Sequence, residues 1–215
     1  MTPIELYTCQ TPNGHKASIM LEEVGLPYSV RLVDIEKGDQ TKPDLLALNP
    51  NNKIPVIVDR DAGRTVFESG AILHYLARRS GKLQPVGAQE ADDTLTWTLF
   101  QAAHVGPTLG QLWNYKIFAP EKIPYVIERF ERETGRVFRV LDSRLKHHEH
   151  IVGKSYGIAD VMTWPWINAA VTRLGLSLDD APDLARWYAA IGRRSAVVRG
   201  IAVPALPKHR LPLRS

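Results

Sequence analysis

Short runs of apolar and alternating residues open the chain and predict a strand–helix–strand unit. Residues 4–8 predict a short strand, and a loop with Pro12 and Gly14 follows it. Apolar residues then recur with the spacing of one helix face: Ala17, Met20, Leu21 and Val24. Residues 28–33 alternate and predict a second strand. Because these elements follow one another within about thirty residues, we expect two parallel strands joined by a right-handed crossover.

The pattern continues with a second helix and a hairpin. Residues 42–48 predict a short helix, and residues 55–59 form an apolar run typical of a strand. Residues 60–64 contain Asp and Gly and favour a hairpin turn into a returning strand at 65–67. A further helix opens at 68–70. The N-terminal part therefore predicts the element order β-α-β-α-β-β-α.

From residue 89 onward the hydrophobic pattern is helical. Apolar residues recur with a helical period at 127–141 and again at 184–191, and no strand pattern interrupts them. We therefore predict an α/β domain at 1–81, an all-α helical bundle at 89–203 and an extended tail at 204–215.

Composition and charge exclude several classes of protein. The chain has 215 residues, of which 44% are hydrophobic, and a net charge of +4. It lacks a signal peptide and an apolar run that could span a bilayer, so we expect a cytoplasmic protein without membrane association. The mild positive charge comes without a basic stripe or a nucleic-acid motif, so we expect no nucleic-acid partner. Cys9 is the only cysteine, which excludes an intramolecular disulfide and a cysteine-rich zinc site.

A histidine cluster near residue 148 resembles a metal site. His147, His148 and His150 surround Glu149, but they lack a catalytic spacing such as H-E-x-x-H. We favour a frayed helix end, where imidazolium groups meet the negative end of the helix dipole, and expect no bound metal.

Pro55 stands at the start of an apolar strand, where a residue without an N–H group is awkward. A cis peptide bond before it would turn the backbone of Ile54 toward solvent. The N–H and C=O groups of Ile54 could then pair with a peptide-like ligand as an added strand. The alternative is a trans proline at the strand start, and spacing alone leaves both interpretations open.

Glu68 and Ser69 stand at the start of a predicted helix. The first turn of a helix has unpaired N–H groups and a partial positive charge, which favour a carboxylate. Ser69 can add a hydroxyl and Glu68 can accept from an ammonium group, so together they suit an amino-acid head group. A simple helix N-cap explains the same pair.

The loop at 11–16 precedes the first helix, and open α/β sheets bind ligands at such positions. Free N–H groups there could face a thiolate, with Thr11 and Asn13 as short donors. Turn chemistry is the alternative, since Pro, Asn and Gly are turn residues. The chain has neither a G-x-G-x-x-G motif nor a P-loop, which argues against dinucleotide and ATP binding.

Taken in order, these segments resemble the glutathione transferases, and most nearly the bacterial nu class, which is related to the yeast nitrogen-regulator prion protein. The specific segments are T-P-N-G-H-K at 11–16 and N-N-K-I-P at 51–55. The Glu-Ser pair within 67–73 is general to the superfamily. The resemblance extends to about residue 203.

The resemblance implies a thioredoxin-like N-terminal domain before the helical one, a homodimer, and glutathione or glutathione disulfide as ligand. The Ile54–Pro55 bond would be cis, and the Ile54 backbone would pair with the cysteinyl part of glutathione. Glu68 and Ser69 would hold the γ-glutamyl end.

It also implies roles for five further residues. Lys53 and Gln40 would reach toward the glycyl carboxylate. Thr11 and Asn13 would face the sulfur atom. Arg129 would lie near a second, more open site, in its own subunit or in that of the partner.

The resemblance implies a glutathione-dependent disulfide-bond reductase, active also on peroxides, in which the bound glutathione supplies the nucleophilic thiolate. Cys9 does not align with the catalytic cysteine of the beta or omega classes, and no tyrosine matches the catalytic tyrosine of the mammalian classes. Two alternatives stay open: conjugation of glutathione to small electrophiles, and a regulatory protein that binds glutathione without turnover.

Overall fold

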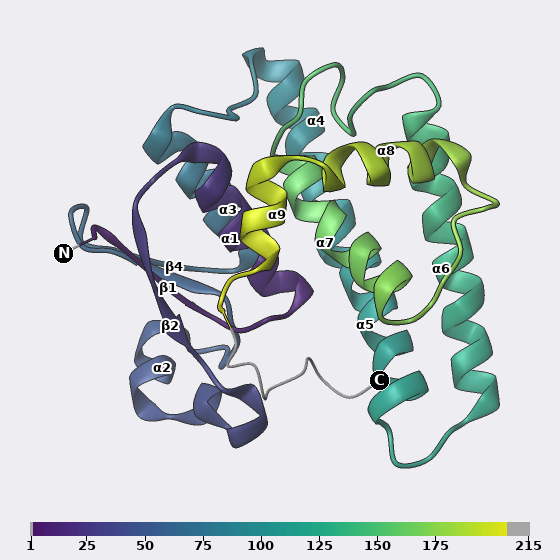
Figure 1. Cartoon of the computed structure of the whole chain (residues 1–215), viewed down its shortest axis with the longest axis horizontal. Coiled ribbons are helices and arrows are strands. Elements are labelled where there is room, and N and C mark those ends of the chain that lie inside the picture. Colours follow the sequence, from purple (N-terminus) through teal and green to yellow (C-terminus); the bar gives the residue numbers. More distant parts are fainter. Residues whose placement is uncertain (1, 206–215) are drawn as a thin grey trace. The chain divides into compact units, whose positions relative to one another are not determined.

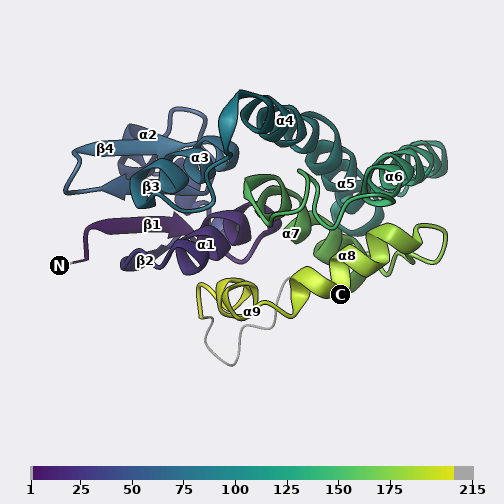
Figure 2. The ribbon, with the colours of Figure 1, turned by 90° about the horizontal axis from the view of Figure 1, so that it is seen from above.

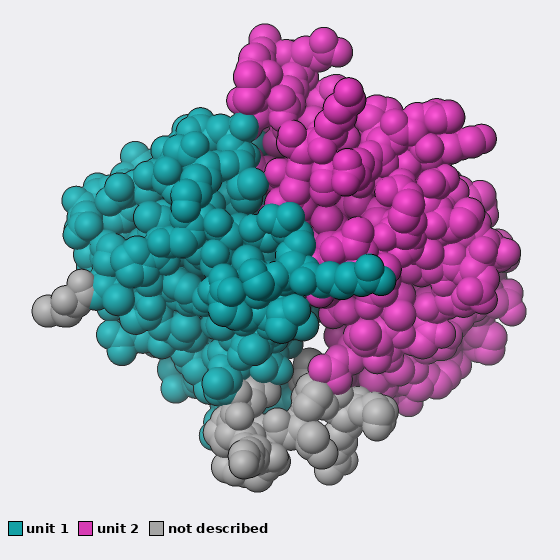
Figure 3. Space-filling model, turned by 45° about the horizontal axis from the view of Figure 1, so that its top comes forward, with its two compact units in different colours: residues 1–84, 193–214 teal, residues 85–192, 215 magenta. Residues whose placement is uncertain are grey.

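The chain forms two units, shown in different colours in Figure 3. The structure, a computed structural model, describes residues 2–205. The first unit consists of residues 2–84 and 193–205, and the second of residues 85–192.

Strand β1 (Ile4–Thr8) is an inner strand of the sheet in the first unit, where the strand order is β2-β1-β3-β4 (Figure 1). β2 (Tyr28–Leu32) pairs with β1 in parallel, as the crossover unit predicts. β3 (Val56–Asp59) and β4 (Arg64–Phe67) form the predicted hairpin and add antiparallel to the other edge of β1. The residues of β3 are all buried, whereas those of β2 are half-buried or exposed.

The helices of the first unit begin and end at residues that sequence rules favour. They are α1 (Pro12–Val24), α2 (Pro43–Leu48), α3 (Ser69–Ser80) and α9 (Ser195–Ile201), with short 3₁₀ turns η1 (Ile35–Lys37) and η2 (Asp39–Thr41). Thr11 caps the start of α1, since its Oγ1 accepts a hydrogen bond from the Gly14 N–H at 3.1 Å. Gly25, with a φ of +72°, ends α1 in the left-handed conformation that glycine tolerates.

Helix α9 packs against α1 although the two are far apart in sequence (Figure 2). A Cβ atom at Gly200 would lie 2.6 Å from the Ile19 Cα, so only glycine permits this approach. The Ser18 hydroxyl donates to the Gly200 carbonyl at 2.7 Å. α9 therefore belongs to the first unit. The predicted domain limits at residues 81, 89 and 203 stay a prediction. From residue 206 onward, the predicted tail lies outside the described residues.

The second unit is helical throughout, as predicted. It contains α4 (Gly87–Phe100), α5 (Gly106–Trp113), α6 (Pro124–Leu145), α7 (Ile158–Thr172) and α8 (Pro182–Gly192), with π-helical turns η3 (Gln101–Val105) and η4 (Asn114–Phe118). α7 is buried along most of its length, and α4, α5 and α8 pack on it. Within residues 2–205, no helix has the length and apolarity to cross a membrane.

The start of α7 is fixed by the buried carboxylate of Asp160. Its Oδ2 accepts from the Gly157 N–H at 2.9 Å. Its Oδ1 accepts from the Ile151 N–H at 3.1 Å and from the Trp187 Nε1–H at 2.7 Å. One side chain thus joins the start of α7 to the preceding loop and to α8.

Candidate functional site

A pocket of about 140 Å³ lies in the first unit, where three segments distant in sequence meet. Its lining is Asn13, Asn51, Lys53, Ile54, Pro55, Glu68 and Ser69. Asn13 lies in the first turn of α1, residues 51–55 lead into β3, and Ser69 opens α3. Two helix starts and one strand start therefore contribute to one cavity.

The strand-start wall of the pocket is formed by Ile54 and Pro55. Their peptide bond is cis, as the resemblance implies. The Ile54 side chain packs on a small buried cluster formed by Val33, Leu45 and Val56. No hydrogen bond joins the backbone N–H or C=O of Ile54 to another residue among those described. These groups can therefore pair with an extended peptide-like ligand.

Glu68 precedes α3, and its backbone has a φ of 67° and a ψ of 117°. A residue with a side chain at such a positive φ is strained by about 1–3 kcal/mol, and strain of this kind concentrates at functional sites. Its Oε1 accepts a hydrogen bond of 3.4 Å from the Asn51 Nδ2. The exposed carboxylate lines the pocket, where it can accept from an ammonium group.

Ser69 is the first residue of α3, and only 9% of it is exposed. Behind it lies Lys16 of α1, which is 2% exposed and whose Nζ donates to the Ser69 Oγ at 3.4 Å. Burial lowers the pKa of Lys16 to about 7, against the opposing attraction of the Glu68 carboxylate. Helix start, hydroxyl and lysine favour an anionic group, while Glu68 beside them favours a cationic one.

The pocket brings together six of the residues predicted from the sequence: Asn13, Lys53, Ile54, Pro55, Glu68 and Ser69. Thr11, Gln40 and Arg129 are not in its lining. Thr11 acts as the N-cap of α1. Gln40 lies half-buried in η2, and its Oε1 has no hydrogen-bond partner among the described residues. Arg129 is exposed on α6 in the second unit.

Comparison with known proteins identifies the family. Residues 11–79 match the N-terminal domain of glutathione S-transferase, and residues 124–190 match its C-terminal domain. The disulfide-bond oxidoreductase YfcG of Escherichia coli K12 is 42% identical over 212 residues, which span 96% of this chain and 98% of that protein. The chain belongs to the glutathione S-transferase family.

Two solved glutathione transferases share the fold of this family member. The protein from Burkholderia graminis is 40% identical with a TM-score of 0.91, covers 95% of this chain and 89% of its own, and has two glutathione molecules bound per subunit. The protein from Pseudomonas putida is 36% identical with a TM-score of 0.90, covers 94% of this chain and 92% of its own, and has one glutathione disulfide bound per subunit. The predicted fold class, a thioredoxin-like domain followed by a helical one, is confirmed, and the protein is a glutathione transferase-like enzyme.

Two residues belong to segments singled out in the sequence but received no role there: Asn51, which lines the pocket, and Lys16, which lies behind it. Asn51 lines the pocket and bonds Glu68, although an asparagine before a strand gives no signal beyond turn chemistry. Lys16 lies four residues before Met20 and eight before Val24, which places it on the buried face of the predicted helix. That spacing was the available signal.

The only cysteine of this protein is not part of the pocket lining. Cys9 is buried at the end of β1, and burial raises the pKa of its thiol to about 11. A thiol with so high a pKa carries little thiolate near neutral pH, and the thiolate is the reactive form. Cys9 is therefore a poor nucleophile.

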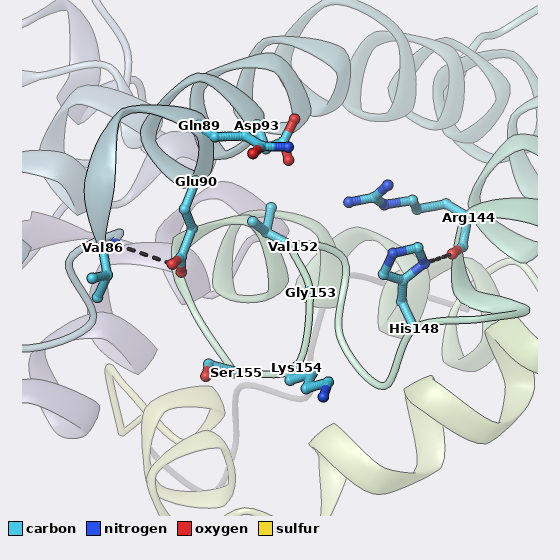
Figure 4. A pocket seen from close by; sticks show the side chains of 10 residues that line it. All are labelled: Val86, Gln89, Glu90, Asp93, Arg144, His148, Val152, Gly153, Lys154 and Ser155. Carbon is cyan, nitrogen blue, oxygen red and sulfur yellow. Dashed lines mark hydrogen bonds between the residues drawn. The ribbon is translucent and has the colours of Figure 1, made fainter.

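The second unit contains a wider pocket of about 510 Å³ (Figure 4). Its lining is Val86, Gln89, Glu90, Asp93, Arg144, His148, Val152, Gly153, Lys154 and Ser155. The Glu90 Oε2 accepts from the Val86 N–H at 3.1 Å, and the Arg144 Nε donates to the Ile151 carbonyl at 2.7 Å. Acidic side chains of α4 line it together with basic ones from α6 and the loop that follows. No residue predicted as part of a site lies in it.

Proposed function

We propose that this protein is a glutathione-dependent disulfide-bond reductase, active also on peroxides, in which bound glutathione provides the nucleophile. One observation carries the proposal: the pocket combines a place for an amino-acid head group with the amide of Asn13, while Cys9 is buried and its pKa is raised. A disulfide reductase without a reactive thiol of its own needs one from its ligand. The name of YfcG, and the glutathione and glutathione disulfide bound in the two solved relatives, support the proposal.

In this proposal, different pocket residues bind different parts of the glutathione molecule. The Glu68 carboxylate accepts from the γ-glutamyl ammonium group, and Ser69 with the N-terminal N–H groups of α3 donates to the α-carboxylate. The Ile54 backbone pairs with the cysteinyl residue. Lys53 attracts the glycyl carboxylate, with Gln40 as a further donor.

Asn13 and Thr11 act on the sulfur atom. A hydrogen bond from the Asn13 amide and the positive end of the α1 dipole lower the pKa of the glutathione thiol and favour the thiolate. The Thr11 hydroxyl accepts from the Gly14 N–H and makes a hydrogen bond with Cys9, so it donates to the glutathione sulfur only after turning away from Cys9.

The reaction proceeds in two exchanges. The glutathione thiolate attacks one sulfur of the substrate disulfide, forms a mixed disulfide and expels one substrate thiolate. A second glutathione thiolate attacks the glutathione sulfur of the mixed disulfide, which releases glutathione disulfide and the second substrate thiolate. The two protons released by the two glutathione thiols protonate the two substrate thiolates. On a peroxide, the thiolate attacks one oxygen and breaks the O–O bond, which yields glutathione sulfenic acid and, after protonation of the leaving oxygen, an alcohol or water. The thiol of the second glutathione condenses with the sulfenic acid to the same glutathione disulfide and releases one water.

We further propose that the protein acts as a homodimer in the cytoplasm and that Arg129 binds the second glutathione, from its own subunit or from the partner's. The guanidinium group suits a carboxylate bidentately. The two glutathione molecules per subunit of the Burkholderia graminis protein support a second site.

The test is steady-state reduction of hydroxyethyl disulfide by glutathione, coupled to glutathione reductase and NADPH. We expect turnover well above the uncatalysed rate, and the same turnover in the Cys9→Ala variant. Loss of turnover in that variant would make Cys9 the nucleophile and refute the proposal. Absence of turnover in the original protein, with glutathione bound in a titration, would instead favour conjugation or binding alone. A conjugation assay with an aryl halide then separates these two.

A further inference from the structure

The further inference concerns Lys16, a lysine buried behind the pocket. Lysine is almost never fully buried unless it is paired, because its charge is costly to remove from water. Lys16 is only 2% exposed, in the middle of the buried face of α1, and it donates a hydrogen bond to Ser69. Its Nζ lies 3.4 Å from the Ser69 Oγ, and Ser69 lines the pocket. A single hydroxyl group therefore separates this amine from the cavity.

The pKa of Lys16 depends on the other charged and titratable groups of α1 and of the elements packed against it. On α3 and before it these are Glu68, His74, Tyr75, Arg78 and Arg79; on α9 and before it, Arg193, Arg194 and Arg199; on β1, Glu5 and Tyr7; and on α1 itself, His15, Glu22 and Glu23. Arg194 pairs with Glu23 at 2.7 Å, and Arg199 pairs with Glu22 at 2.6 Å. Of these groups, Glu68 is the one whose charge raises the pKa of Lys16, against the lowering by burial.

We propose that Lys16 is a positioning residue that couples glutathione binding to proton uptake, because its ammonium form stabilises the γ-glutamyl α-carboxylate through Ser69. The inference rests on the proposed function, in which that carboxylate binds at Ser69. An anion placed beside a buried amine raises the pKa of the amine, since opposite charges attract strongly where water is excluded. With a pKa of about 7 in the empty pocket, Lys16 is partly neutral near neutral pH, so there is a proton to gain.

The sign and size of the coupling follow from linkage. The complex has the higher pKa, so the extra affinity is present below the pKa of the empty protein and is lost as the pH rises through the pKa of the complex. A rise of one unit from about 7 corresponds to the uptake of about half a proton per site at pH 7.5. The same rise makes binding about sevenfold tighter at pH 6 than at pH 8.5.

The experiment is calorimetric titration with S-methylglutathione, which has no thiol that could ionise. Titrations at pH 7.5 in phosphate and in Tris, which differ in ionisation enthalpy, give the number of protons taken up. Affinities at pH 6 and pH 8.5 give the linkage. The variants are Lys16→Met, which removes the charge and the donor, and Lys16→Gln, which keeps a donor for Ser69 and protects the test if the first variant does not fold. His15 and His74 are unchanged in both, so their contribution to the pH profile cancels.

Two lysine controls define the specificity of the effect. Lys146→Met, at an exposed position of the second unit, should leave uptake and affinity unchanged. Lys53→Met, in the pocket lining, should weaken binding by a similar factor at both pH values without abolishing the uptake.

We expect uptake by the original protein and its loss, with a flat pH profile, in both Lys16 variants. Binding without proton uptake, or equal uptake in a folded Lys16 variant, overturns the inference and leaves the proposed function intact. Absence of any binding refutes the proposed function and this inference together.

Discussion

Glu68→Gly should make the protein more stable and at the same time weaken its hold on glutathione. The Glu68 backbone, with a φ of 67°, lies in a region that only glycine adopts without strain. Relief of that strain is worth about 1–3 kcal/mol. Glycine also gives the unfolded chain more backbone freedom, which lowers the free energy of unfolding by about 0.4–1 kcal/mol and offsets part of this gain. The net expected gain in the free energy of unfolding is about 1 kcal/mol.

Glu68→Ala is the matched control, because it removes the same carboxylate and keeps the strain. Glu68 is exposed and accepts a single hydrogen bond of 3.4 Å from Asn51, so the loss of its side chain alone should change stability by less than about 0.5 kcal/mol. Both variants lose the acceptor of the γ-glutamyl ammonium group. A hydrogen bond between charged groups contributes about 1.5–3 kcal/mol, so both should bind glutathione about tenfold to hundredfold more weakly.

Thermal unfolding followed by circular dichroism measures the first effect, and calorimetric titration with glutathione measures the second. A gain of about 1 kcal/mol corresponds to a rise in Tm of about 2–4 °C for a chain of this size. The reasoning is refuted if the glycine variant is no more stable than the alanine variant. It is also refuted if either variant binds glutathione as tightly as the original protein.

Four other substitutions or reactions test the site and the fold. Asn13→Ala should reduce kcat for disulfide reduction by about tenfold or more, with a smaller effect on glutathione affinity, and an unchanged kcat would remove Asn13 from the mechanism. Asp160→Ala leaves three donors unpaired, two of them buried, and should cost about 4 kcal/mol in urea unfolding, whereas Asp160→Asn, which keeps an acceptor at Oδ1, should cost about half as much. Gly200→Ala should destabilise by about 2 kcal/mol because its Cβ meets the α1 backbone, whereas Gly135→Ala, in α6, should be neutral or stabilising by up to about 1 kcal/mol. Alkylation of Cys9 by iodoacetamide at pH 7.5 should be roughly a hundredfold slower than that of free cysteine, since its pKa is raised to about 11.

The order of elements could be predicted because the local patterns are unambiguous. Alternation in 28–33 and the i, i+3, i+4 spacing after Ala17 specify a strand and a helix wherever they occur. Gly25 marks the end of the helix between them, and it does adopt the left-handed conformation there. Such signals depend only on neighbours in sequence.

The position of α9 could not be predicted, because it depends on contacts across the chain. The predicted helical pattern at residues 184–191 ends before α9, and nothing in the sequence shows which helix the segment that follows it packs against. The informative residue is Gly200, where a side chain would collide with Ile19. A glycine near a helix end has the bland interpretation of a cap, so its role in close packing emerges only from the structure.

The candidate site was predicted in part for a similar reason. Glu68 and Ser69 stand at a helix start, a local feature with a known electrostatic preference, and both line the pocket. Asn51 and Lys16 act through partners that are distant in sequence: Asn51 bonds Glu68, and Lys16 bonds Ser69. Their contribution depends on how the segments fold together, which local patterns do not specify.

The start of α3 collects two features that are unfavourable for an empty protein. The Glu68 backbone is strained, and the Lys16 amine is removed from water. A glycine and an apolar residue at these positions would be easier to fold, so stability alone does not account for either. A ligand with one ammonium and one carboxylate group accounts for both, because the fold already holds the Glu68 carboxylate for the first and the Lys16 ammonium group for the second. The free energy that the empty pocket gives up in this way is recovered on binding, as in other preorganised sites. Two unfavourable features of the first unit therefore lie where a dipolar head group binds in the proposed function.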